Sequence, residues 1–176
     1  SRGMNVYISQ GDETKVLVKA DENLLDVIET RLEGNTLKIT SKQNIRKATT
    51  KKVFVTTPNI SSIKSSAGSN VYSETVLRTR NLSLSGSSGS NMKLNVSSEK
   101  MVVTVSSGSN IKLDGTTGSF SGKASSGSNL KAEELNSKDC SANVSSGANI
   151  WIGTKSGNVV KISPDGTHLF LGNYSD

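Results

Sequence analysis

The sequence is poor in the residues that most often carry catalysis, metal binding or covalent cross-links. Its 176 residues include one cysteine, one histidine, two prolines and only 4% aromatic residues. The single cysteine excludes an internal disulfide, and the single histidine, His168, excludes a metal site with several histidine ligands. Phosphate-binding loops and dinucleotide-binding fingerprints are also missing, so the sequence predicts no cofactor.

Long apolar runs and concentrated charge are also absent. No stretch reaches about 18 apolar residues, so the sequence contains no candidate transmembrane helix. The net charge is +6, and residues 1–60 and 61–176 each carry half of this excess. No basic run is interleaved with aromatic residues, so we expect no nucleic-acid partner.

What the sequence does contain is a short repeat of the form Ser-Ser-Gly-Ser-Asn. The five copies occupy residues 66–70, 87–91, 106–110, 125–129 and 145–149, two of them with an alanine in place of a serine. The asparagines follow one another after 21, 19, 19 and 20 residues. A fixed period of about 20 residues is typical of a solenoid, in which each repeat contacts only its neighbours.

Alignment on the repeated asparagine sorts the flanking residues into columns. The position after it is apolar in every copy: Val71, Met92, Ile111, Leu130 and Ile150. The next position holds Tyr72, Lys93, Lys112, Lys131 and Trp151. This alternation of period 2 predicts a half-buried strand on each side of the turn. Cys140 shares an apolar column with Met101 and Phe120, so we expect a buried structural thiol.

These columns predict an all-β fold, a right-handed parallel β-helix with 19–21 residues per coil. Each coil would hold two strands joined by the repeated turn. A second connection would close each coil, for example residues 114–118 in one coil and residues 133–137 in the next. We interpret the chain as one continuous domain. Residues 1–62 form irregular first coils and a cap, residues 63–157 the regular coils, and residues 158–176 a C-terminal cap.

The two ends are less regular than the middle. Residues 14–20 and 52–57 each alternate as a strand. Residues 26–32 and 36–40 flank Glu33-Gly34-Asn35, which indicates a hairpin or a coil corner. At the other end, residues 159–162 and 169–171 flank a Pro-Asp-Gly turn and predict a final hairpin.

The repeated turn has a structural explanation. Glycine at one fixed position indicates a backbone with positive φ, and neighbouring asparagines in stacked coils can form an amide ladder. The residues concerned are Gly68, Gly89, Gly108, Gly127 and Gly147, with Asn70, Asn91, Asn110, Asn129 and Asn149. The alternative is that the polar strip binds a repetitive ligand such as a glycan or ice.

The outward column is the candidate ligand-binding site: Tyr72, Lys93, Lys112, Lys131 and Trp151. Its lysines suit an acidic polysaccharide, and an exposed aromatic ring can stack on a sugar. The alternative is a solvated face on which Asn95, Asp114 and Glu133, two positions further on, compensate the lysines. Asp114 and Glu133, one coil apart, also suggest the carboxylate pair of a glycosidase, although a lysine beside each would keep both ionised.

The sequence resembles the GIN domain family, described as the heads of auto-transporter adhesins and found mainly in Bacteroidetes. The resemblance rests on residues 6–13, 20–25, 28–30, 33–39 and 53–56 and on the Ser-Gly-Ser-Asn coils. Residues 150–176 depart from the pattern. The resemblance implies a secreted or envelope-attached β-helix, and it supplies no catalytic motif.

We therefore expect a non-enzymatic adhesion module of the cell surface or envelope that binds a glycan or a surface protein. The alternatives are a polysaccharide-active β-helix enzyme and a structural module that self-associates into homo-oligomers. The chain begins in mid-pattern at Ser1, so we expect that a signal segment has been removed.

Overall fold

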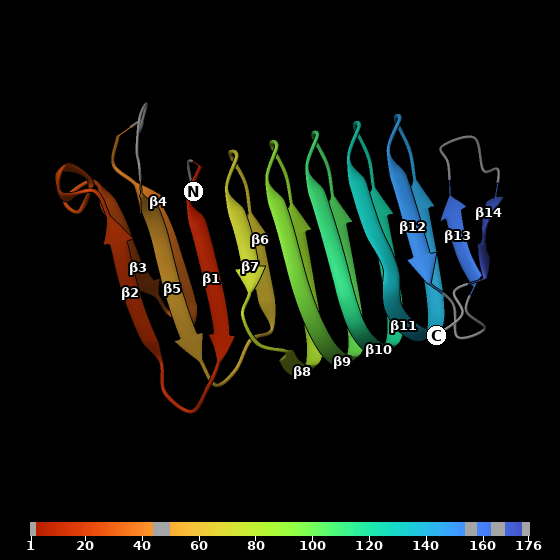
Figure 1. Cartoon of the computed structure of the whole chain (residues 1–176), viewed down its shortest axis with the longest axis horizontal. Helices are drawn as coiled ribbons and strands as arrows, with labels where there is room; N and C mark the ends of the chain where they lie inside the picture. Colours follow the sequence, from red (N-terminus) through yellow and green to blue (C-terminus); the bar gives the residue numbers. More distant parts are fainter. Residues whose placement is uncertain (1–2, 44–49, 154–157, 163–167, 174–176) are drawn as a thin grey trace.

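The computed structural model describes residues 3–43, 50–153, 158–162 and 168–173, with side chains up to residue 153. Over these residues the chain forms a parallel β-solenoid (Figure 1). The regular coils contain β7 (Asn70–Ser73), β8 (Leu77–Gly86), β9 (Asn91–Val105), β10 (Asn110–Ala124) and β11 (Asn129–Val144). Equivalent strands pair in parallel, and the repeated turns line up along one edge of the stack. The predicted β-solenoid is confirmed.

At the N-terminal end, segments that are distant in the sequence lie side by side. The elements are β1 (Asn5–Gln10), β2 (Lys15–Ala20), a 3-10 turn at Glu22–Leu24, β3 (Ile28–Glu33), β4 (Thr36–Ser41), β5 (Lys51–Thr57) and β6 (Ser62–Ser65). Strand β1 lies between β5 and β7 and is parallel to both. Strand β2 pairs antiparallel with β5 and ends the sheet. The β3–β4 pair is a separate antiparallel hairpin, so the hairpin alternative for residues 26–40 is correct.

At the C-terminal end, parallel pairing gives way to antiparallel pairing. Strand β12 (Asn149–Gly153) pairs in parallel with β11, then β13 (Asn158–Ile162) and β14 (His168–Asn173) continue the sheet antiparallel. This is the arrangement expected of a final hairpin. Its predicted turn, residues 164–167, lies outside the described residues.

In three coils the second corner differs from the expected loop, because β9, β10 and β11 run through it without interruption, whereas β7 and β8 are separated by residues 74–76. Strand β10 is paired in parallel with β9 and β11 on both sides of Gly115 and Thr116, with a one-residue register shift against β11 between Lys112 and Asp114. Two glycines make this continuity possible in β10. A Cβ at Gly115 would lie 2.1 Å from the Val96 carbonyl oxygen, and one at Gly118 would lie 2.5 Å from that of Glu99.

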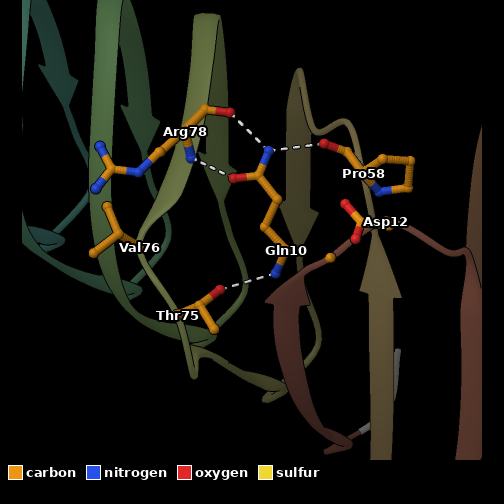
Figure 2. A pocket seen from close by; sticks show the side chains of 7 residues that line it. Gln10, Asp12, Pro58, Thr75, Val76 and Arg78 are labelled. Atoms are coloured by element: carbon orange, nitrogen blue, oxygen red, sulfur yellow. Dashed lines mark hydrogen bonds between the residues drawn. The ribbon is translucent and has the colours of Figure 1, made fainter.

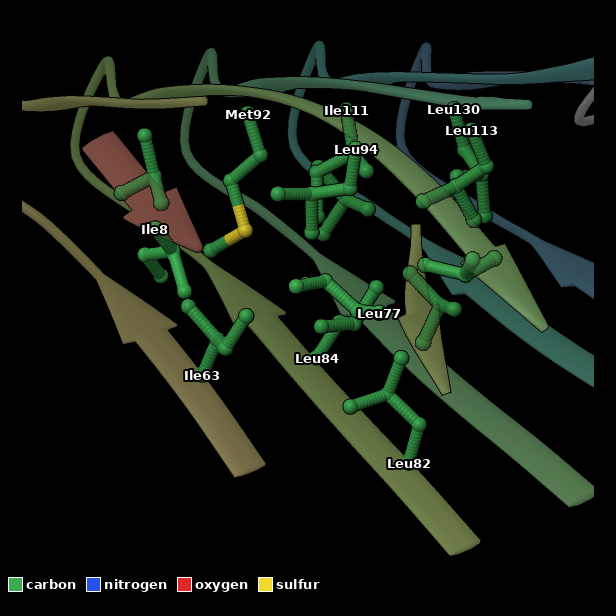
Figure 3. Close-up of a cluster of buried hydrophobic side chains, with 14 of the residues drawn as sticks. Ile8, Ile63, Leu77, Leu82, Leu84, Met92, Leu94, Ile111, Leu113 and Leu130 are labelled. Atoms are coloured by element: carbon green, nitrogen blue, oxygen red, sulfur yellow. The ribbon is translucent and has the colours of Figure 1, made fainter. Parts of the chain in front are cut away.

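The predicted inward columns form the core between the two faces of the coils (Figure 3). Leu94, Leu113 and Ala132 follow one another in successive coils and are fully buried. Where Gly122 replaces an apolar residue, the Phe120 ring occupies the space, since a Cβ on Gly122 would lie 2.9 Å from Phe120 Cε1. Burial of this continuous core is the main driving force that orders the coils.

Each repeated turn has two consecutive residues with positive φ, the glycine and the residue before it. Ser88, Ser107 and Ser126 have φ of 52–53°, a conformation that is strained for a residue with a Cβ. Bonds between turns offset this strain: the Gly89 N–H donates to the Ser107 carbonyl, and the Gly108 N–H to that of Ser126, each at 3.0 Å. The stacking of coils therefore stabilises a turn that a single coil would hold poorly.

The side chains of the repeated asparagines form an unbroken amide ladder. From Asn91 to Asn149, each Nδ2 donates to the Oδ1 of the asparagine in the preceding coil at 2.9–3.2 Å. The ladder continues one step further than predicted, because Asn70 Nδ2 donates to Asn5 Oδ1 at 2.8 Å. Gly3 has φ of 64° and its N–H donates to the Ala67 carbonyl, so residues 3–5 form a sixth, degenerate turn.

We expect Asn110→Asp to destabilise the protein at neutral pH. The new carboxylate still accepts from Asn129, but it faces the Asn91 oxygen as a second acceptor, and one hydrogen bond is lost. The expected cost is about 1 kcal/mol in the free energy of unfolding, measured by urea denaturation. The facing acceptor favours the protonated form of the new carboxyl and so raises its pKa in the folded protein. The loss in free energy of unfolding should therefore become smaller as the pH falls, because the protonated acid can again donate a hydrogen bond to Asn91. Asn136→Asp, at an exposed position of β11 outside the ladder, is the control; an equal loss there would contradict the explanation.

Cys140 is not buried, contrary to the prediction. Its register is as expected, opposite Phe120, but the side chain is exposed. The reason is that β12 pairs only with residues 129–132 of β11, so no strand of the described chain stacks on the second half of β11. The protein on its inner side still removes water from the sulfur. This desolvation raises the pKa of the thiol above its usual value, against the effect of a hydrogen bond with Ser137.

Candidate ligand-binding face

The five predicted ligand-binding residues lie in one row across the outward face of the sheet. Tyr72, Lys93, Lys112, Lys131 and Trp151 occupy equivalent positions in β7, β9, β10, β11 and β12, each in register with the next. The row continues beyond the predicted residues through Tyr7, Phe54 and Leu17 of β1, β5 and β2. At about 4.8 Å per strand, these eight positions extend roughly 34 Å along the solenoid.

Three rings at the N-terminal end of this row form an aromatic ladder. Tyr7 stacks between Phe54 and Tyr72, with ring centroids 5.0 and 5.3 Å apart and interplanar angles of 17° and 26°. Because the rings stack along the solenoid axis, they cover each other's faces and turn their edges outward. The sequence carried this signal in the alternation of residues 5–10 and 51–57, but their place beside β7 depends on long-range pairing.

The central lysine of the row is neutralised by carboxylates. Lys112 Nζ lies 3.1 Å from Glu134 Oε1 and 3.8 Å from Asp114 Oδ1. The hydrogen bond to Glu134 raises the pKa of Lys112, partial burial opposes this, and the charges of Asp114, Glu134 and Glu133 add to the rise. Lys131 instead places its Nζ 5.6 Å from the Trp151 ring, a cation–π contact.

The acids beside this row differ from the expected arrangement. The register between β10 and β11 shifts by one residue after Lys112, so Asp114 pairs with Glu134 and not with Glu133. Both glutamates lie between the buried Ala132 and Leu135, as in a β-bulge. The predicted pair of Asp114 and Glu133 is therefore out of register, and Lys112 instead forms salt bridges with Asp114 and Glu134.

A cleft of about 370 Å³ opens where β1 ends, between Pro58 and residues 75–78 (Figure 2). The Gln10 side chain links the two sides of this cleft by hydrogen bonds. Its amide donates to the carbonyls of Pro58 and Arg78 at 2.8 and 2.9 Å, and its oxygen accepts from the Arg78 N–H at 2.6 Å. The Arg78 guanidinium and the Asp12 carboxylate point to opposite sides of Gln10, so the charged groups of this cleft do not converge.

The described residues contain no group of three or more His, Cys, Asp or Glu side chains placed to hold a metal ion. Among the same residues there is no helix with the length and apolar character needed to cross a membrane. His168 is the first residue of β14, two strands beyond β12, the strand that carries Trp151.

Comparison with protein families gives a match over almost the whole chain. Residues 1–173 match the family model described as "Putative auto-transporter adhesin, head GIN domain". The chain belongs to the GIN domain family. No curated protein sequence gives a match to this GIN domain.

Solved structures show the same fold. A protein from Bacteroides fragilis named a putative adhesin superposes with a TM-score of 0.79 at 21% identity, covering 84% of this GIN domain and 70% of that chain. A protein from Parabacteroides distasonis named a putative lipid binding protein superposes with a TM-score of 0.64 at 18% identity, covering 84% of this GIN domain and 73% of that chain. A protein from Parabacteroides merdae named a putative adhesin superposes with a TM-score of 0.63 at 14% identity, covering 85% of this GIN domain and 73% of that chain.

Proposed function

We propose that this GIN domain is a non-enzymatic binding module of a surface-exposed or secreted adhesin, and that its ligand is a glycan or a surface protein. The outward face of the sheet, with the row from Leu17 to Trp151, is the proposed binding face. The observation that carries the proposal is the register of this row, which repeats one side-chain position across eight strands.

The chemistry of the face supports binding rather than catalysis. A glycosidase needs two carboxylates on either side of a scissile bond, with environments that separate their pKa values. Here Asp114 shares Lys112 with Glu134, and the acids lie on β10 and β11, outside the lining of the cleft at Gln10. Membership of a family named for adhesin heads supports a location at the surface or outside the cell.

The test is binding to an array of neutral and acidic glycans, with Lys93→Glu and Trp151→Ala beside the wild type. Lys93 is exposed and makes no ion pair within the described part of the chain. Its reversal should weaken binding of an acidic ligand at least tenfold, because attraction becomes repulsion. Lys123→Glu is the matched control, since Lys123 is an exposed lysine in the second half of β10, on another face of the coil.

Loss of binding in Lys93→Glu and Trp151→Ala, with Lys123→Glu unchanged, would support the proposed face. Equal losses in all three variants would place the ligand elsewhere. Absence of binding to any glycan, together with absence of binding to surface-protein extracts, would contradict the proposed function.

A further inference from the structure

The N-terminal end of the binding face carries a patch that the sequence did not reveal. Strands β2, β5, β1 and β7 place apolar and aromatic side chains side by side, with lysines on the neighbouring rows. We define the N-terminal patch as Leu17, Phe54, Tyr7 and Tyr72 with Lys15, Lys19 and Lys52. Leu17 is 47% exposed, the largest apolar exposure on this face of the described sheet.

Two lysines of this patch face each other across neighbouring strands. Lys19 is directly opposite Lys52 in the β2–β5 pair, and both side chains are exposed. Like charges at opposed positions destabilise a sheet. Neither lysine forms a salt bridge within the described residues; the Lys19 Nζ lies 5.4 Å from the Phe54 ring centroid, and the Lys52 Nζ 5.8 Å from that of Tyr7.

This arrangement contrasts with the middle of the same face. There the positive charge of Lys112 is shared by Asp114 and Glu134. Next to the N-terminal patch, the carboxylate of Asp21, two residues after Lys19, accepts a hydrogen bond from the Thr50 N–H at 3.0 Å, and that of Glu74 accepts one from the Ser9 hydroxyl at 3.1 Å. The opposed pair of Lys19 and Lys52 therefore carries two positive charges beside the aromatic ladder without a salt bridge in the described part of the chain, whereas the charge of Lys112 is shared with two carboxylates.

We propose that the N-terminal patch is the anchoring site for an acidic polysaccharide, with Lys19 and Lys52 binding its carboxylate or sulfate groups. This inference rests on the proposed function and names its ligand class. An anion between Lys19 and Lys52 would reduce the repulsion of the pair, so the positive charge of the pair complements the charge of the ligand. The hydroxyls of Tyr7 and Tyr72 make no hydrogen bond with other described residues and supply donors for sugar oxygens.

The geometry of the ladder favours a charged, hydroxylated polymer over a neutral sugar. Neutral sugars bind aromatic residues through exposed ring faces, but the faces inside this ladder are covered by neighbouring rings. The patch is also continuous with the amide ladder and the lysine row, which run along the solenoid axis. A linear chain laid along this axis contacts successive strands through the same side-chain position.

The experiment measures binding of polygalacturonate and of neutral dextran to the whole chain by surface plasmon resonance at 50 and 300 mM salt. The variant is Lys19→Gln with Lys52→Gln, and the matched control is Lys100→Gln with Lys123→Gln, two exposed lysines of the other coil face. We expect wild-type and control protein to bind polygalacturonate, with at least tenfold weaker binding in the patch variant. Because salt screens exposed charges, 300 mM salt should weaken wild-type binding more than that of the patch variant.

The outcomes separate this inference from the proposed function. Binding of polygalacturonate that depends on Lys93 but not on Lys19 and Lys52, or binding of dextran alone, would overturn the inference and leave the binding module intact. Binding of poly-glutamate or of anionic phospholipid vesicles with the same lysine dependence, and none of polygalacturonate, would overturn the ligand class. Absence of binding to every probe would count against both. A thermal unfolding curve of the patch variant that matches wild type shows that any loss is not due to misfolding.

Discussion

Gly115→Ala is expected to lower the free energy of unfolding by about 3 kcal/mol or more, the scale of severe single substitutions. Gly115 has φ of +113°, which L side chains rarely adopt, and a Cβ there would lie 2.1 Å from the carbonyl oxygen of Val96 in the preceding coil. That atom is backbone within a parallel ladder, so it cannot move without breaking pairing between β9 and β10. Urea denaturation followed by circular dichroism measures the loss.

Gly108→Ala is the matched control for this prediction. Gly108 also has positive φ, 68°, but nothing lies within 4 Å of its Cβ position, and Ser107 beside it already has φ of 53° with a Cβ. Its expected cost is about 1 kcal/mol, from backbone conformation alone. If Gly108→Ala were as damaging as Gly115→Ala, backbone conformation rather than the close approach to Val96 would account for both results.

The regular coils could be predicted because the same physical requirement recurs in each of them. A stacked coil needs one apolar position facing inward next to each corner, and Met92, Ile111 and Leu130 supply it in register. The amide ladder follows from the same repetition, since Asn91, Asn110 and Asn129 are forced into adjacent positions. Local alternation and a fixed period were sufficient for these features.

Unequal repeat lengths mark the places where extra residues enter the coils. The pairing offset is 21 residues between Tyr72 and Lys93 but 19 between Leu77 and Val96, so two extra residues lie between β7 and β8. These residues help line the cleft at Gln10. The coil after Asn129 is one residue longer than the coil before it, and the extra residue forms the bulge that brings Glu134 to Lys112.

Features at the ends depended on contacts that no local pattern encodes. Gly3 and Asn5 have the spacing of Gly68 and Asn70, but the serines of the repeat are missing there, so the repeat pattern does not identify this degenerate first turn. The stacking of Phe54 on Tyr7 requires β1 to insert beside β5, a pairing between residues 47 apart in the sequence. The exposure of Cys140 depends on which coil is the last of the solenoid, and the alternation of apolar and polar residues does not encode this.

Val103→Ala is expected to lower the free energy of unfolding by about 2–3 kcal/mol, whereas Val102→Ala changes it by less than about 0.5 kcal/mol. The two valines are neighbours in β9, but Val103 is fully buried and Val102 is 38% exposed. Val103 lies in the inward column between Leu84 and Gly122. Because Gly122 has no side chain and the Phe120 ring already fills its space, little can move into the cavity that Val103→Ala creates.

This pair of variants tests the alternation of faces directly, because the same two methyl groups are removed from adjacent positions of one strand. Both variants lose the same β-propensity and the same side-chain entropy, so these contributions cancel in the comparison. The remaining difference reports burial in the stack of coils, and it should appear in the denaturation midpoint with similar slopes for the two variants. Equal destabilisation by Val102→Ala and Val103→Ala would mean that the outward face of β9 is also covered, for example by another copy of the chain. In that case the difference in free energy of unfolding between Val102→Ala and Val103→Ala should reappear when the protein is diluted, since coverage by a second molecule depends on concentration.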